Sequence, residues 1–304
     1  MTTVPPKLLA PAGFITTTIE RVEPHRRSGR AVFATVMTAP MALWQIVLFL
    51  GPLLFLIGLS FWLVRNFQLA PAFESVNWES MLSQPHFWAT FVRTCAYAAG
   101  AAALTSLIAL PAAYAMALVL NDNQRRLLSF LLVIPFFTSY LVRVYAWQVF
   151  LSDQGLINTA LGLIGLGPFG MLNTAFGTFV GYLTLSLPLV VLIQCMALRM
   201  VNRHHVEAAH NLGCGPLATV FRVVLPSAKA GLTIAALFCF IFSFGDFVSP
   251  VYLGGGTQPT LAMLIIDTTK AGQQWPRAAV VSIAMIATLM TVAFAATSYA
   301  YRRR

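Results

Sequence analysis

Charged side chains are scarce in this sequence. Only 9% of its 304 residues are Asp, Glu, Lys or Arg, whereas 58% are hydrophobic. Soluble domains carry about a quarter charged residues, so the composition excludes an ordinary soluble protein and indicates an integral membrane protein. The net charge of +10 does not predict nucleic-acid binding, because the basic residues lie between apolar runs and not on a separate exposed domain.

Motifs for catalysis and for metal binding are also missing. None of the three lysines, Lys7, Lys229 and Lys270, follows a glycine, which excludes the Gly-Lys-Ser/Thr phosphate loop of an ATPase. Neither His-Glu-x-x-His nor Gly-x-Ser-x-Gly occurs, and this disfavours a membrane hydrolase. The four cysteines form neither a disulfide framework nor a zinc spacing. We expect a chain that is not an enzyme and binds no cofactor or metal of its own.

Long uncharged intervals are abundant instead. A helix needs about 20 mostly apolar residues to cross the hydrocarbon core, and six intervals qualify, one of them interrupted by Arg143 and another by Asp246. They lie within Ala31–Val64, Thr94–Asn121, Leu127–Leu151, Met171–Leu198, Ala230–Leu253 and Ala278–Tyr301. The sequence therefore predicts an all-α membrane protein with about six transmembrane helices.

The basic residues predict the orientation of these spans. With six spans both termini lie on one side, and that side receives fourteen of the nineteen basic residues. The positive-inside rule makes it the cytoplasm. We expect a cytoplasmic tail over residues 1–38, a transmembrane domain over 39–301 with a long cytoplasmic loop at about 199–230, and a cytoplasmic C-terminus at 302–304.

That long loop has the pattern helix, break, helix. Residues His204–Leu212 suit a short helix, and Gly213, Gly215 and Pro216 then interrupt it. A second amphipathic piece follows, with apolar residues at helical spacing up to Pro226. Four polar residues would suffice to join two spans, so the loop is built as a rigid elbow suited to docking on another protein.

The loop resembles the EAA loop of the permease subunits of bacterial ABC importers of type I. The matching residues are Glu207, Ala208, Ala209, Gly213, Leu225, Pro226 and Gly231. Cys214 and Ala230 stand where many members have alanine and proline.

The resemblance implies a MetI-like helix bundle in the bacterial inner membrane, with the short helix of the loop seated in a groove of an ATPase subunit. It also implies four kinds of partner: membrane lipid, a second homologous permease, two ABC ATPase subunits that use ATP and Mg²⁺, and an extracytoplasmic substrate-binding protein.

Two other interpretations of the loop stay open. An amphipathic, glycine-broken segment can lie on the lipid surface. The cluster His204, His205, Glu207 and His210 also contains pairs at helical spacing that could hold a metal ion. The chain as a whole could instead be a stand-alone secondary transporter or a membrane enzyme, although the former should show an internal repeat with broken helices at mid-membrane.

Two further stretches resemble spermidine/putrescine-type permeases. These are YLVRVYAWQVFLSDQGLINTALGLIGL, residues Tyr140–Leu166, and FSFGDFVSPVYLGGG, residues Phe242–Gly256. The resemblance implies import of a small organic cation, with a polyamine first. Permeases for opines or amino-acid derivatives share these patterns, so another solute of that kind is the alternative.

Asp246 is the only acidic residue inside an expected span. An intramembrane charge usually faces the bundle interior or a water-filled path, and aromatic faces attract ammonium groups where water is excluded. The candidate substrate path comprises Asp246, Phe244, Tyr252, Tyr145, Trp147 and Arg143. The alternative is structural: Asp246 pairs with Arg143 or with a backbone group and locks the bundle, and Arg143 snorkels or holds the third span to a neighbour.

Overall fold

The computed structural model describes residues 26–65 and 67–302, and it divides into two units, Met1–Leu54 and Phe55–Arg304. Most of the expected N-terminal tail, residues 1–25, lies outside the described residues, as do Arg303 and Arg304 at the C-terminus.

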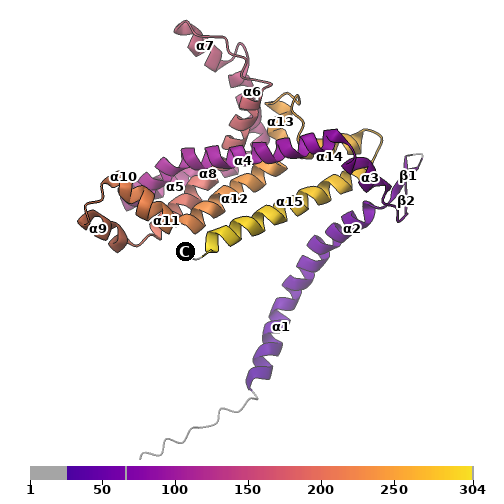
Figure 1. The fold of residues 1–304 in the computed structure, drawn as a ribbon, viewed down its shortest axis with the longest axis horizontal. Helices are drawn as coiled ribbons and strands as arrows, with labels where there is room; N and C mark the ends of the chain where they lie inside the picture. The colour runs from indigo at the N-terminus through magenta and orange to yellow at the C-terminus, as the bar shows by residue number, and fades with distance from the viewer. Residues whose placement is uncertain (1–25, 66, 303–304) are drawn as a thin grey trace, which may run out of the picture. The chain divides into compact units, whose positions relative to one another are not determined.

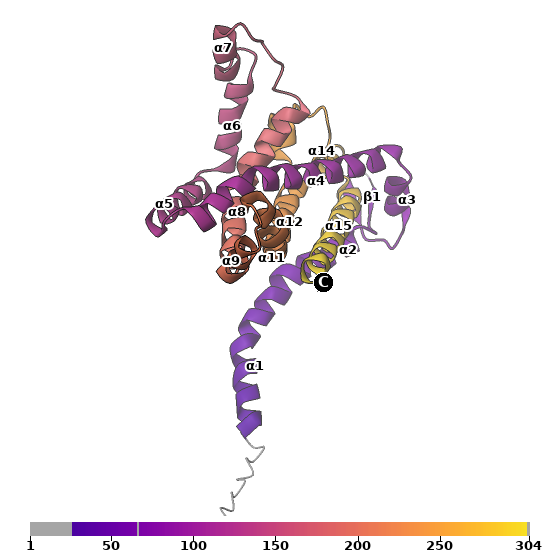
Figure 2. The same cartoon turned by 60° about the vertical axis from the view of Figure 1, so that its left-hand side comes forward.

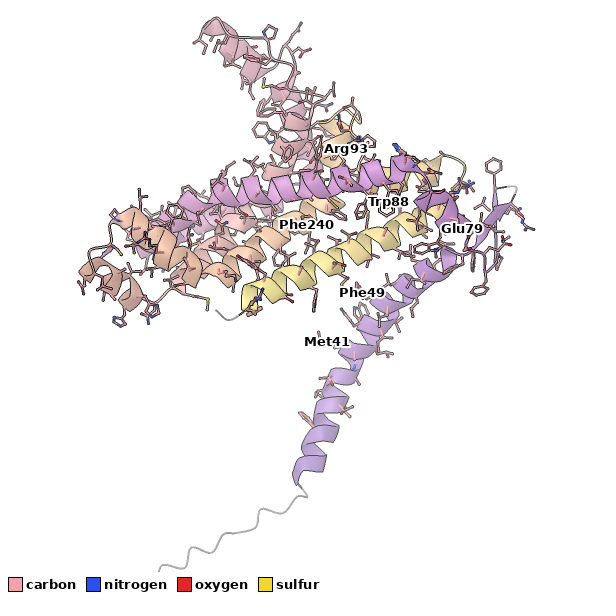
Figure 3. The ribbon with its side chains drawn as sticks, viewed as in Figure 1. Met41, Phe49, Glu79, Trp88, Arg93 and Phe240 are labelled. Atoms are coloured by element: carbon pink, nitrogen blue, oxygen red, sulfur yellow. The ribbon has the colours of Figure 1, made fainter. Side chains whose placement is uncertain are left out.

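The first unit is helical wherever it is described. Helix α1 (Arg26–Gln45) continues through the π-helical turn η1 (Ile46–Leu50) into α2 (Gly51–Leu59), so helix begins inside the stretch expected to be tail. Thr35–Leu59 is long and apolar enough to cross a membrane, as predicted for the first span. Met41 and Phe49 project from this helix and are exposed, as lipid-facing side chains would be (Figure 3).

The second unit carries all the remaining elements. In chain order they are β1 (Leu63–Arg65), β2 (Gln68–Ala70), α3 (Val76–Leu82), α4 (Pro85–Tyr114), η2 (Ala115–Val119), α5 (Asp122–Val133), η3 (Ile134–Phe137), α6 (Tyr140–Leu151), α7 (Leu156–Leu163), α8 (Ala175–Arg199), α9 (Arg203–Asn211), α10 (Pro216–Thr219), η4 (Val220–Val224), α11 (Leu225–Ser227), α12 (Lys229–Gly245), α13 (Val248–Tyr252), α14 (Leu261–Lys270) and α15 (Trp275–Tyr301). The two strands form one antiparallel hairpin, in which Leu63 pairs with Ala70.

Three long helices, α4, α8 and α12, pack against one another and form the core, and α15 packs against α12 and α14. Small side chains such as Ala98, Ala109 and Ala235 are fully buried between them, so the backbones approach closely. Figures 1 and 2 show α9 at one end of this bundle and α3 at the other. The ends of α8 and α12 therefore position the loop that contains α9.

Four of the six expected spans are single helical segments, and two are bent. The third breaks by 94° between Phe137 and Tyr140, and helix α12 of the fifth is bent by 75° from the segment Pro216–Ser227 that precedes it. A proline accompanies each bend, because Pro135 lies in the 3₁₀ turn before the first and Pro226 in α11 before the second. The predicted third span, Leu127–Leu151, is therefore a bent pair of helices and not one straight helix.

The fifth span also ends earlier than expected. Helix α12 stops at Gly245, and Asp246 then leads into the separate short helix α13. A further helix, α14, was not expected from the sequence, and α4 begins at Pro85 and not near Thr94. Arg93 is thus inside a helix (Figure 3), where it donates a 3.5 Å hydrogen bond to the carbonyl of Pro259.

Candidate functional site

Asp246 lies at the corner between α12 and α13, with its residue only 7% exposed. One carboxylate oxygen, Oδ1, accepts a 2.8 Å bond from the backbone N–H of Val248. The other, Oδ2, accepts from the Tyr140 hydroxyl at 2.7 Å, from Ser249 Oγ at 2.5 Å and from the Ser249 N–H at 3.3 Å. The carboxylate therefore caps the first turn of α13 and ties it to α6.

Four donors approach the Asp246 carboxylate in this arrangement. A carboxylate offers about four acceptor positions, two on each oxygen, and three of the donors reach Oδ2 whereas one reaches Oδ1. The Tyr140 hydroxyl also contacts Ser249 Oγ, which closes the cluster. No ion pair to Asp246 occurs among the residues that the structure describes. Of the two structural partners considered for it, the structure brings a backbone group to Asp246 and does not bring Arg143.

Arg143 connects α6 to α8. Its Nη1 donates a 3.0 Å bond to the carbonyl of Thr184, and its guanidinium lies 5.7 Å from the centre of the Tyr140 ring. Pro188 follows four residues after Thr184 within α8, and proline has no N–H to bond the carbonyl at i−4. Arg143 therefore satisfies the carbonyl that Pro188 leaves free.

A hollow of about 430 Å³ opens beside this contact, bounded by Arg143, Trp147, Thr184 and Pro188 with neighbouring apolar side chains. The Nε of Arg143 is buried there without a hydrogen-bond partner. A fixed cation would repel a cationic solute at this wall, so Arg143 is better placed to hold α6 on α8 than to meet such a solute.

The aromatic candidates separate into two groups. Tyr145 and Tyr252 meet edge to face, with ring centres 5.1 Å apart, and Tyr145 is exposed. Trp147 packs against Phe150. Phe244, in contrast, is fully buried and stacks on Phe240 with ring centres 5.4 Å apart, so it presents no surface to a path in this arrangement.

Sequence reasoning missed Tyr140 and Ser249 as partners of Asp246. A local signal existed for Ser249, because an Asp that caps a helix accepts a hydrogen bond from the backbone N–H two or three positions later in the chain. No signal identifies Tyr140, which is 106 residues away in the chain. The pairing depends on the packing of α6 against α13.

The loop between α8 and α12 begins with α9, as predicted for His204–Leu212. Asn202 caps the helix by accepting a 2.9 Å bond from the His204 N–H. At the other end the Gly213 N–H bonds the carbonyl of His210 and the Cys214 N–H bonds that of Ala209, at 2.9 and 3.0 Å. This is a Schellman ending, and Gly213 has the left-handed φ of 80° that such an ending requires.

The exposed surface of this loop combines polar, small and apolar side chains. Glu207 and Ala208 are exposed, whereas Ala209 is buried against the rest of the loop. Glu207 pairs with His204 at 3.5 Å between Oε2 and Nδ1. Leu212, Leu217 and Phe221 are 85%, 74% and 66% exposed. We call the surface formed by Glu207, Ala208, Leu212, Leu217 and Phe221 the loop face.

The second half of the loop returns the chain to the bundle. The π-helical turn η4 carries Val224 into the core before Leu225 and Pro226 start α11. Gly231 then lies so close to α8 that a Cβ on it would clash with the Cβ of Ala197. The described residues contain no group of three or more His, Cys, Asp or Glu side chains that could hold a metal ion.

A model of the family described as "Binding-protein-dependent transport system inner membrane component" matches residues 106–304, well over half of the chain. The chain belongs to this family. It is therefore a permease subunit of an ABC importer and a multi-pass inner-membrane protein, and it works in a binding-protein-dependent system. Permease subunits are not themselves enzymes, and the family assignment sets aside both the stand-alone transporter and the membrane enzyme.

Two curated relatives resemble this permease over most of its length. The spermidine/putrescine transport system permease protein PotB of Haemophilus influenzae is 29% identical over 267 residues, which cover 86% of this chain and 92% of PotB. The inner membrane ABC transporter permease protein YdcU of Escherichia coli is 26% identical over 230 residues, which cover 70% of this chain and 72% of YdcU.

A solved structure shares the fold. One chain of a bacterial ABC transporter involved in the import of the acidic polysaccharide alginate superposes with a TM-score of 0.72, covering 91% of this permease and 97% of that chain. The sequence identity is 15%, so this likeness speaks for the fold alone. The predicted all-α, MetI-like permease fold is confirmed.

Proposed function

We propose that this permease imports a polyamine of the spermidine/putrescine class. The observation that carries the proposal is its 29% identity to PotB over 86% of the chain. The corner around Asp246 supports it, because the carboxylate holds the first turn of α13, and α13 also carries Tyr252, which meets the exposed Tyr145 edge to face. Aromatic faces bind ammonium groups when water is partly excluded.

The candidate path residues have different roles in this proposal. Tyr145, Tyr252 and Trp147 offer faces to the amine. Asp246 is buried and hydrogen-bonded, so it meets the substrate directly only if a donor such as Tyr140 moves away. Phe244 and Arg143 hold the surrounding helices in place. Phe244 is buried, and Arg143 donates a hydrogen bond to the Thr184 carbonyl of α8.

Competition for uptake tests the substrate class. Cells that lack their own polyamine importers receive this permease with its neighbouring transport genes, and accumulation of labelled spermidine is measured against an excess of putrescine, of an opine or of an amino-acid derivative. We expect competition by putrescine alone. Accumulation of an opine and not of spermidine would show that the permease imports the alternative solute and not a polyamine.

We further propose that the loop face docks on an ABC ATPase subunit on the cytoplasmic side. The complex then comprises this chain, a second homologous permease, two ATPase subunits that use ATP and Mg²⁺, and an extracytoplasmic binding protein. Three exposed apolar side chains beside Glu207 support docking, because exposed apolar patches mark interaction sites. The Schellman ending at Gly213 supports it too, since a fixed turn can transmit a push to α8 and α12.

Copurification tests whether the loop face docks on the ATPase subunit. The variant Leu217→Ser should insert normally but retain about tenfold less ATPase subunit, because a well-packed interfacial leucine contributes roughly 1–2 kcal/mol. Leu163→Ser is the matched control, because Leu163 is also highly exposed but lies on α7, away from the loop. Equal retention of the ATPase in both variants would remove the docking role.

A further inference from the structure

A second charged feature lies apart from both the Asp246 corner and the loop face. It is a groove of about 420 Å³ between α5 and α8. Asp122, Arg125, Arg126 and Ser129 line it from α5, and Leu192, Met196 and Arg199 are among the residues that line it from α8. We call it the arginine groove.

Helical spacing explains why these residues converge. On each helix the lining positions fall at i, i+3, i+4 and i+7, which share one face. Helix α5 begins at the charged end of the groove, with Asn121 and Gln124 forming a reciprocal cap. Helix α8 ends there with Arg199 in its last turn. The two helices are in contact, so their faces form the two walls.

The groove carries a surplus of positive charge. Its single acid, Asp122, pairs with Arg125 and is itself 82% exposed, while the Arg125 side chain is only 14% exposed. Arg126 and Arg199 are exposed and form no ion pair with any residue that the structure describes. Three guanidinium groups therefore face one carboxylate, and the remaining positive charge favours an anion at this place.

The groove is apolar at its other end. On α8, Met196 lines it one turn before Arg199 and Leu192 two turns before. A ligand that fits must place a negative charge among the arginines and a hydrocarbon chain along these side chains.

We propose that the arginine groove binds an anionic phospholipid, with its phosphate among Arg125, Arg126 and Arg199 and an acyl chain along Leu192 and Met196. Guanidinium groups bind phosphate in a bidentate manner, and basic pockets between transmembrane helices on the cytoplasmic side bind anionic headgroups. The positive-inside orientation places this end of α8 in the cytoplasmic leaflet. The lipid would tie α5 to the helix that leads into α9.

Lipid retention by the purified full-length chain tests the proposal. The chain in detergent is mixed with phosphatidylglycerol or with zwitterionic phosphatidylcholine, and bound lipid is counted by native mass spectrometry. We expect the wild type to prefer phosphatidylglycerol, and the double variant R126Q/R199Q to lose about tenfold or more of that preference, since each cation near an anionic headgroup contributes appreciably. Arg125 stays in place because it is paired within the fold.

Three controls test whether the groove binds a lipid and whether its arginines are responsible. R222Q/R302Q removes the same charge from exposed positions outside the groove and should keep the preference. R126K/R199K keeps the charge and should restore most of it, which distinguishes loss of binding from loss of folding. Inorganic phosphate should not displace the lipid, because it has no acyl chain for Leu192 and Met196.

Several results would overturn the proposal. R126Q/R199Q could retain phosphatidylglycerol as well as the wild type does, or inorganic phosphate could displace it fully, in which case the site takes a free anion. Loss of the lipid when the complete importer is assembled would show that a protein subunit covers the groove.

Discussion

At the scale of single residues, Asp246 has the structural role that was the alternative prediction for it from the sequence. A lone acid inside an apolar span suggested a contact with a cationic substrate, yet its carboxylate already accepts four hydrogen bonds from Tyr140, Ser249 and Val248. Buried polar groups are costly unless they are bonded. The corner between α12 and α13 therefore depends on this side chain whatever the substrate is.

Removing the Asp246 carboxylate should destabilise the permease. Asp246→Ala leaves the Tyr140 hydroxyl and the Val248 N–H without their acceptor, and the loss should be about 2–3 kcal/mol. Thermal unfolding of the purified chain, followed by tryptophan fluorescence, measures it. Asp267→Ala is the matched control, since Asp267 is exposed on α14, and its midpoint should stay close to that of the wild type. An unchanged midpoint for Asp246→Ala would contradict the capping role.

The Arg143 contact predicts a specific coupling with Pro188. Arg143→Leu should cost about 1–2 kcal/mol, because the carbonyl of Thr184 loses its donor. In the background Pro188→Ala a new N–H at position 188 can bond that carbonyl, so Arg143→Leu should cost clearly less. A double-mutant cycle on unfolding free energies measures the coupling. Additive costs would show that Arg143 does not replace the missing proline bond.

At the scale of elements, the sequence predicted what depends on local signals. Uncharged intervals located the four helices long enough to span a membrane and the two bent pairs, and Gly213 with Pro216 marked the break after α9. The bends of 94° and 75° were less accessible, because proline indicates where a helix can break but not by how much. Helix α14 was missed because its ten residues are too few for a span and include Asp267 and Lys270.

The ending of α9 gives a prediction about Gly213. Open space surrounds the position of a Cβ there, so a substitution costs only the left-handed φ of 80°. Gly213→Ala should cost about 1 kcal/mol, whereas Gly213→Asn should cost less because Asn tolerates this conformation. Hydrogen exchange at the amides of Gly213 and Cys214 should accelerate about fivefold in the alanine variant. Equal exchange in both variants would argue against the Schellman ending.

The close approach of α12 to α8 predicts that a second substitution restores the stability lost in a first one. Gly231→Ala introduces a methyl group against Ala197, and overpacking of this kind costs about 1–3 kcal/mol. The second change Ala197→Gly makes room and should recover most of the loss in thermal midpoint. If Ala197→Gly worsens the first variant, then the two helices do not meet at these residues.

At the scale of the whole molecule, the chain is one subunit of an ABC importer. The helices of its second unit form a bundle, its loop face projects from one end of that bundle, and the chain lacks the Gly-Lys-Ser/Thr loop that an ATPase needs. The family follows from the sequence because the loop motif is local. The substrate does not follow from the sequence in the same way, because the contacts around Asp246 arise from residues far apart in the chain.

Uptake into proteoliposomes tests the central claim, an ATP-driven polyamine import through this permease, most directly. Vesicles contain this chain, its partner permease and the ATPase subunits, with the binding protein on the side opposite the ATPases. Labelled spermidine should accumulate with ATP and Mg²⁺ and not with a non-hydrolysable ATP analogue. Accumulation without ATP hydrolysis, or none for any polyamine while another solute accumulates with ATP, would contradict the account.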